Sequence, residues 1–339
     1  MLTFRFAVAC PAALLAFTPS EDALRFAPQA ESEVRRTLTT TANMELTEIS
    51  AMVNGEDQPL PDEFELVFDY EEELVILDRF GATEDDRVTG LQRSFESLHA
   101  ARSYSGPEGT QDAELSSELG ASAIVFNWDG DEEAYSIAFA EDEDGDEDLL
   151  EDLEFDMDAS FLLPPGEVEE GESWRLEPGL VEQLADLAGD LRFEEEDEDE
   201  DEEDMMEELI EEAGEQVDGD FTATFVGFRE EDEVRVAEIR LEADVSGTAE
   251  GSADIDEEGP DGTNIEGTQE LAVELNNVLT GTLLWNVDAG RMHSLEASTE
   301  LTIQNNISAS LDFGQFQLES LQEMTFEGVS ELTVSVEAP

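Results

Sequence analysis

The stretch EIRLEADV, residues 238–245, alternates charged and apolar side chains without a break. Its apolar positions are Ile239, Leu241, Ala243 and Val245. A repeat of two residues is the period of a β-strand that buries one face and exposes the other to water. Strands of a parallel sheet are buried on both faces and read as continuous apolar runs, so this pattern predicts an antiparallel sheet.

The same alternation recurs along most of the chain. The clearest further runs are residues 38–46, 64–70, 295–303 and 332–336. Two hairpins fit between such runs, because Asp129-Gly130 and Asp288-Ala289-Gly290 are typical turn sequences. Strands of this length, joined by short turns, account for both the N-terminal and the C-terminal portions of the chain.

Helical spacing is confined to short stretches in the middle of the chain. They are Leu91-Phe95-Leu98, residues 149–153, residues 180–191 and residues 205–210. Runs of strands with segregated helices are typical of α+β proteins. The sequence therefore predicts a mainly β (α+β) fold, with long antiparallel strands in a strongly curved sheet or half-open barrel. Short helices from the central segment are expected to pack on one face.

The N-terminus has the form of a secretory signal peptide over residues 1–20. A single Arg precedes an apolar run from Phe6 to Phe17, and polar residues follow. Residues 7–10 resemble a lipoprotein cleavage box, but the apolar run continues past Cys10, so we do not expect lipoprotein anchoring through Cys10. We expect an exported protein, periplasmic or extracellular, in which residues 21–339 form a single β-rich domain.

The charge balance is strongly acidic over the whole chain. The formal net charge is -77, from 91 acidic and 14 basic residues, and every basic residue is an Arg. Salt adaptation, cation binding and a compositional bias would each explain such acidity. Nucleic acid and anionic membrane surfaces are not expected as partners, because phosphate groups require positive charge on the protein. Divalent cations remain candidate partners.

Two acidic tracts, residues 141–158 and 194–215, hold 12 and 16 of the carboxylates. We interpret both as acidic, solvated insertions in the domain. Glu194–Asp204 is eleven carboxylates in a row, and such a block cannot bury apolar surface and repels itself. This block is therefore predicted to be a disordered surface loop.

The first acidic tract nearly matches a calcium-binding loop. Its ligand positions from the third to the twelfth would be Asp142, Asp144, Asp146, Asp148 and Glu151. The first position, normally Asp, is Ala140. These residues are a weak candidate Ca²⁺ site, and a solvated acidic run is the alternative. No other cofactor is expected.

No motif identifies a catalytic reaction, and no catalytic residue is predicted. The chain has no Lys, which excludes a P-loop lysine and a Schiff base, and its single Cys lies in the predicted signal peptide. His99 and His293 are the only histidines and form no metal-binding motif. Carboxylate pairs are so frequent that none of them points to a glycosidase. We therefore expect a non-catalytic protein.

The segment FLLPPGEVEEGESWRLEPG contains an L-P-x-x-x-V-x-x-G-x-x-W arrangement. It is formed by Leu163, Pro164, Val168, Gly171 and Trp174. This arrangement resembles a motif of uncharacterised exported bacterial proteins that are rich in β-structure and have no established function. The resemblance covers about a dozen residues and implies an exported, β-rich domain, whereas the acidic insertions depart from the pattern. Physically, the prolines and glycines make turns and Trp174 provides a large apolar ring, which indicates an architectural role.

Three functions stay open at this point. The first is a binding or structural module outside the cytoplasm. The second is a carrier of an apolar ligand such as an acyl chain, which requires an unfilled cavity lined by residues such as Phe64, Phe68, Phe225, Leu241 and Leu301. The third is a carboxylate-based hydrolase, which requires an Asp or Glu buried in a cleft with a raised pKa.

The acidity predicts that salt stabilises the folded chain. We expect the melting temperature to rise with NaCl, because screening weakens the repulsion among carboxylates. Thermal unfolding in a NaCl series and in millimolar CaCl₂ at matched ionic strength measures the effect. A rise specific to calcium would support a defined site, whereas a melting temperature independent of salt would contradict the account of self-repulsion.

Overall fold

The structure is a computed structural model of the chain. It describes residues 24–59, 65–84, 87–107, 109–141, 143, 145–151, 153–194, 209–210, 212–214, 216–258, 264–312 and 317–338. The predicted signal peptide, Cys10 and all but the first residue of Glu194–Asp204 lie outside these ranges. Among the described helices, none is both long enough and apolar enough to cross a bilayer.

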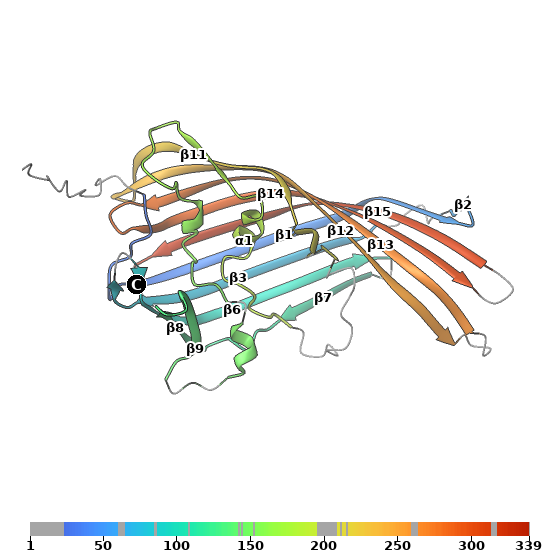
Figure 1. Cartoon of the computed structure of the whole chain (residues 1–339), viewed down its shortest axis with the longest axis horizontal. Coiled ribbons are helices and arrows are strands. Elements are labelled where there is room, and N and C mark those ends of the chain that lie inside the picture. Colours follow the sequence, from blue (N-terminus) through green and yellow to red (C-terminus); the bar gives the residue numbers. More distant parts are fainter. Residues whose placement is uncertain are drawn as a thin grey trace, which may run out of the picture.

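One antiparallel sheet of thirteen strands dominates the described residues (Figure 1). The hydrogen-bonded path begins with β10 (Ser173–Leu176), β11 (Asp218–Glu231), β12 (Val234–Glu258), β13 (Asn264–Asn286), β14 (Arg291–Asp312) and β15 (Gln317–Glu337). It continues with β1 (Glu33–Val53), β3 (Val67–Phe80), β6 (Gly90–Gly106), β8 (Ala123–Asp129) and β9 (Ala134–Phe139). Two shorter strands, β2 (Glu56–Asp57) and β7 (Gly109–Leu115), pair with β1 and β6, whereas β4 (Thr83–Glu84) and β5 (Arg87–Val88) pair only with each other.

The two β-rich portions of the chain meet at the pairing of β1 with β15. Arg35 lies opposite Glu337 and Val53 opposite Ser320, so the pairing runs along nearly the whole of both strands. In Figure 1 the first strand of the chain and the last lie side by side in the middle of the sheet. Residues almost three hundred positions apart therefore form the centre of the sheet. Bringing them together carries a large entropic cost of loop closure.

The predicted fold class is confirmed. The sheet is antiparallel throughout, curved and not closed, because β9 and β10 are its two ends. Both predicted hairpins are present, β8–β9 around Asp129-Gly130 and β13–β14 around residues 288–290. The described residues between β9 and β11, here called the central segment, contain the short helices η1 (Glu147–Leu150), η2 (Ser160–Leu162) and α1 (Leu180–Ala185). They pack on one face of the sheet, here called the inner face (Figure 1).

The helical interpretation of Leu91, Phe95 and Leu98 is wrong, because these residues belong to β6. Leu91 and Phe95 face inward on the first part of the strand. A β-bulge then inserts Glu96 between the pairs Phe95–Ile76 and Ser97–Val75, and the inward positions change from odd to even numbers. The bulge thereby produces a spacing of four and three residues that imitates a helix.

The expectation of a solvated insertion over residues 141–158 also needs correction. The described residues of 141–148 are exposed, but Leu150, Leu153 and Met157 are buried in the core, and Asp158 is buried with them. The second half of the tract packs because apolar residues are interspersed with its carboxylates. Within 194–215, Glu194 is exposed whereas Leu209 and Ala213 are buried against the sheet.

Four charged side chains are buried together beneath the central segment. Arg36 donates to Asp78 and to Asp158, with nitrogen–oxygen distances of 2.5 Å in both pairs. Arg93 donates from Nε and Nη2 to the two oxygens of Asp78, at 2.9 and 3.1 Å. Each residue is at most 1% exposed, so desolvation is compensated by pairing within the group. Burial by itself would lower the pKa of Arg36, but Asp158 and Asp78 reverse that effect and raise the pKa.

This buried network joins the central segment to the sheet. Arg93 also donates to the carbonyl oxygens of Glu154 and Phe155, at 2.5 and 3.1 Å. The backbone N–H of Met292, at the start of β14, donates to Asp158 at 3.0 Å. Because Arg36, Asp78 and Arg93 belong to the neighbouring strands β1, β3 and β6, one group of charges fixes the segment over several strands.

Replacement of Arg36 tests this network. We expect Arg36→Met to lower the free energy of unfolding by about 3–5 kcal/mol, because it leaves two buried carboxylates short of a counter-charge. Arg175→Met is the matched control, since it removes the same charge from a pair with Asp220 in which the Arg side chain is 67% exposed. The control should cost less than about 1 kcal/mol. Urea denaturation at one salt concentration measures both, and equal losses would contradict a special role for the buried group.

Candidate functional site

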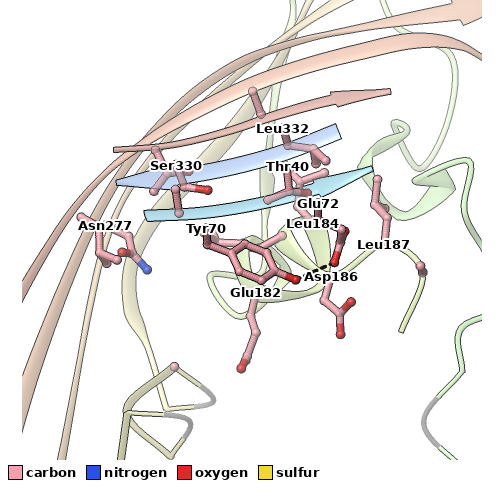
Figure 2. Close-up of a pocket in the computed structure, with 18 of the residues that line it drawn as sticks. Thr40, Tyr70, Glu72, Glu182, Leu184, Asp186, Leu187, Asn277, Ser330 and Leu332 are labelled. Atoms are coloured by element: carbon pink, nitrogen blue, oxygen red, sulfur yellow. Dashed lines mark hydrogen bonds between the residues drawn. The ribbon is translucent and has the colours of Figure 1, made fainter. Parts of the chain in front are cut away.

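A cavity of about 820 Å³ lies between the inner face of the sheet and the central segment (Figure 2). The strands β1, β3, β13, β14 and β15 form its floor. Helix α1, the residues 186–191 that follow it and Phe193 form much of the opposite wall. The site is therefore a space between two layers of the same chain.

The cavity separates two packed apolar clusters. The larger cluster lines one side through Leu38, Leu74, Leu279 and Leu332 on the sheet and Val181, Leu184 and Leu187 on the central segment. The smaller cluster lines the other side through Leu275, Ile303, Leu301 and Ile210. Most of the lining is therefore apolar, and the sheet continues from one cluster to the other beneath the empty space.

Glycine at position 247 of β12 allows the smaller cluster to form. A Cβ atom there would lie 1.8 Å from the carbonyl oxygen of Ala213, so the backbone of the central segment rests directly on the strand. Four residues further along the same face, a Cβ atom at Gly251 would lie 3.1 Å from the side chain of Leu209. This close approach positions Ile210 and Gly214 at the cavity wall.

A polar group gathers around Glu72, which β3 directs into the cavity. The hydroxyl of Tyr70 donates to Glu72 Oε2 at 2.9 Å, and Thr40 on β1 forms a second hydrogen bond to the carboxylate. Burial raises the pKa of Glu72, and these two hydrogen bonds oppose the rise. Burial and the neighbouring carboxylate raise the pKa of Tyr70, so this hydroxyl stays protonated as a donor at neutral pH.

Asp186, at the end of α1, adds a second carboxylate to this group. Figure 2 shows Tyr70, Glu72 and Asp186 converging, with Glu182 nearby. Burial of the carboxylate, together with the negative charges of Asp190 and Glu72, raises the pKa of Asp186 to about 6. More than a third of the residue surface still reaches solvent, so Asp186 lies at the mouth of the cavity rather than in its interior.

Asn277 on β13 lines the cavity away from these carboxylates (Figure 2). Its Oδ1 atom is buried and accepts no hydrogen bond from the described residues. A buried acceptor without a partner costs free energy, so this atom favours an occupant that donates a hydrogen bond. Thr299 and Ser330, paired across β14 and β15, add two hydroxyl groups to the lining.

All charged side chains in the lining are carboxylates. They are Glu72, Glu182, Asp186 and Asp190. Of the chain's 14 arginines, 13 lie in the described ranges and none of these lines the cavity; the remaining one is Arg5. Neither histidine lines it. The charged groups that line the cavity are therefore all negative among the described residues, although Arg192, outside the lining, lies 3.9 Å from Asp190.

The apolar residues named as candidate lining are mostly placed elsewhere. Leu301 lines the cavity, but Phe225 and Leu241 are buried in the larger cluster and Phe68 is 41% exposed. Phe64 lies outside the described residues. Alternation predicts which face of a strand a residue lies on but not which part of that face stays unpacked.

Sequence reasoning missed Glu72 and the four residues of the buried network. On the strands, the sequence feature that could have revealed such residues is a charged residue at a position where the alternation calls for an inward-facing apolar one. Glu72 lies between Tyr70 and Leu74 on the inner face, just as Arg36 lies between Val34 and Leu38. A charge flanked two residues away on both sides by buried apolar residues must itself face inward.

The candidate calcium ligands do not form a site in the described residues. Asp146 caps η1 by accepting the N–H of Asp148 at 3.2 Å, and Asp146, Asp148 and Glu151 are exposed. No group of potential ligands able to hold a metal ion occurs among the described residues. Asp142 and Asp144 lie outside them, so the five-residue calcium hypothesis stays a prediction.

The L-P-x-x-x-V-x-x-G-x-x-W residues lie together at the β10 end of the sheet. Trp174 packs against the larger cluster, and its Nε1 donates to the carbonyl oxygen of Leu162 at 3.1 Å. Gly171 adopts a φ of 84°, and its N–H donates to Phe225 at 2.8 Å. Leu163 and Val168 also pack on the cluster. None of the five motif residues, which include Pro164, lines the cavity.

Comparison with known proteins gives no family assignment. No family model and no curated protein sequence matches the chain. Six chains of solved structures do match, among them an outer membrane channel from Pseudomonas putida F1. That match has a TM-score of 0.20 and 10% identity, and it covers 92% of this chain and 98% of the other. A likeness of this size supports no inference about function.

The raised pKa values predict how pH acts on stability. Asp186 titrates near 3.8 when unfolded and near 6 when folded, so the folded state binds more protons between these values. Stability contributed by this group is therefore lost as pH rises through that window. We expect E72Q/D186N to be more stable than the parent by about 1 kcal/mol above pH 6, because water at the cavity mouth screens part of the effect.

Urea denaturation of both proteins across this pH range tests the prediction. The difference should shrink towards zero near pH 4, where the parent carboxylates are protonated. Glu71 and Glu73 are exposed on the opposite face of β3, so E71Q/E73Q changes the net charge equally without touching the cavity. If the free energy of unfolding depends on pH in the same way in both double variants, the raised pKa values are not those of Glu72 and Asp186.

Proposed function

We propose that the protein is an exported, non-catalytic binding module that holds an apolar ligand in the cavity between the sheet and the central segment. The observation that carries this proposal is an unfilled space of about 820 Å³ between two packed clusters. Ligand-binding pockets have volumes of about 300–1,000 Å³ and are mostly apolar with a few polar groups. Protein interiors otherwise leave few voids larger than a water molecule.

The arrangement of the lining supports a ligand rather than a packing defect. The cavity is bordered by Tyr70 and Glu72, which hydrogen-bond to each other, and by the unpartnered oxygen of Asn277. Apolar floor, defined polar groups and an opening beside Asp186 are the parts that a binding site for an elongated apolar molecule requires. The predicted signal peptide supports a location outside the cytoplasm.

A carboxylate-based hydrolase is the second candidate. It is favoured by Glu72 and Asp186, two carboxyl groups with raised pKa values that border the same cavity. Such values are common at catalytic sites but also occur where carboxylates are buried for other reasons. The first candidate is preferred because the apolar floor accounts for most of the lining, whereas both carboxyl groups lie at one end.

Binding of a neutral apolar fluorophore tests the proposal. We expect Nile red to bind saturably, with one site per chain and a blue-shifted emission. Ser330→Phe should weaken binding at least about tenfold, because the new ring occupies the cavity. Val329→Phe is the matched control, since Val329 is adjacent on β15 and 44% exposed.

Titration of the three proteins, each first shown to be folded by thermal unfolding, gives a clear result. Equal affinity of Ser330→Phe and the parent would contradict the proposed site, and so would the absence of saturable binding. Turnover of p-nitrophenyl esters or glycosides by the parent, abolished in E72Q/D186N, would instead support the hydrolase.

A further inference from the structure

We propose that the natural ligand is a single-chain amphiphile with a cationic, hydrogen-bond-donating head group of the primary-amine class, rather than a fatty acid. This inference rests on the proposed binding function. The head group would lie between Glu72 and Asp186, and the alkyl chain would extend over the apolar floor formed by Leu38, Leu74 and Leu332.

The first step of the argument is the sign of the charge at the cavity mouth. Glu72 and Asp186 interact electrostatically across the opening, and Glu182 adds to the same field, whereas Asp190 lies 3.9 Å from Arg192. No arginine or histidine among the described residues lines the cavity to offset them. A carboxylate head group would therefore meet only like charges, whereas an ammonium group would be attracted.

The second step is the supply of hydrogen-bond donors and acceptors. The donor groups of Tyr70 and Thr40 are already used by Glu72. Acceptor capacity remains at the carboxylates and at the buried Oδ1 of Asn277, which no described residue satisfies. The hydroxyls of Thr299 and Ser330 can donate or accept, so the fixed excess is of acceptors, and an ammonium group offers three donors and no acceptor.

The third step is the contrast with Asp78 and Asp158, two acids that are almost fully buried. Asp78 and Asp158 each have an arginine partner within hydrogen-bonding distance. Glu72 has only the hydroxyl groups of Tyr70 and Thr40, and its charge is not compensated by any basic residue lining the cavity. A partly buried carboxylate without a cation is destabilising, so a bound cation would supply the missing partner.

The general attraction of cations to a chain of net charge -77 must be separated from binding in the cavity. Surface attraction depends on all the carboxylates and is largely removed by salt, because the Debye length at about 0.5 M is only a few ångströms. Removal of two charges at the cavity changes this field very little. Binding in the cavity therefore predicts that the affinity for a cation depends on which two carboxylates are substituted, and not only on how many.

The experiment compares three ligands with the same alkyl chain. Dodecylamine, dodecanol and dodecanoate are titrated below their aggregation concentrations, at neutral pH and about 0.5 M NaCl, where a primary amine is protonated. Isothermal calorimetry and displacement of Nile red measure the affinities. We expect dodecylamine to bind at least about tenfold more tightly than dodecanol, with dodecanoate the weakest of the three.

The variants then locate the effect. E72Q/D186N should bring the affinity for dodecylamine to within a few-fold of that for dodecanol, with little change in dodecanol itself. E71Q/E73Q carries the same change in net charge on the outer face and should keep the preference for the amine. An equal loss of dodecylamine affinity in the two double variants would overturn the inference and indicate general attraction to the surface.

The outcomes also separate this inference from the proposed function. If Nile red and dodecanol bind but dodecylamine binds no more tightly, or dodecanoate binds as well, the head-group inference is wrong and the binding function stands. If none of the probes binds saturably, the proposed function itself fails.

Discussion

The buried pairing of Arg36 and Arg93 with Asp78 and Asp158 is the interaction on which the arrangement of this chain depends. A sheet can be covered only if the covering segment gives up its water, and in this chain that segment is rich in carboxylates. Two of the 14 arginines, Arg36 and Arg93, lie beneath this segment and donate hydrogen bonds to Asp158 and to the carbonyl groups of Glu154 and Phe155. Because charges in such surroundings tolerate no missing partner, the segment is fixed in position over β1, β3 and β6.

The cavity follows from where this attachment ends. Beyond the network the central segment packs on the larger cluster through α1, and its last described part rests on β12 at Gly247; the cavity lies between these two contacts. Glu72 occupies this interval. It faces inward like Asp78 on the same strand, but its partners are hydroxyl groups instead of a guanidinium. The two acids of β3 thus show both outcomes of burying a carboxylate: full pairing inside the core, and a raised pKa beside a cavity.

Much of the fold follows from local pattern, because a period of two residues fixes which side chains share a face whatever the partner strand is. Ile239, Leu241, Ala243 and Val245 are buried as their alternation requires. The pattern failed where a bulge changed its phase, at Glu96, and where charged side chains entered the inner face. It also overestimated how much of the tract 141–158 is exposed, since burial of Asp158 depends on Arg36, 122 residues away along the chain.

The sequence by itself determined the class of the fold, the antiparallel pairing, the positions of two hairpins and the strongly negative net charge. Each of these depends on neighbours along the chain or on a count of charged residues. Only the tertiary structure decided that β1 pairs with β15, that four charges separated in sequence neutralise one another, and that Glu72 and Asp186 border one cavity. The physical reason is that burial and electrostatic coupling act between atoms in contact, and in a sheet of this topology those contacts join residues far apart in the chain.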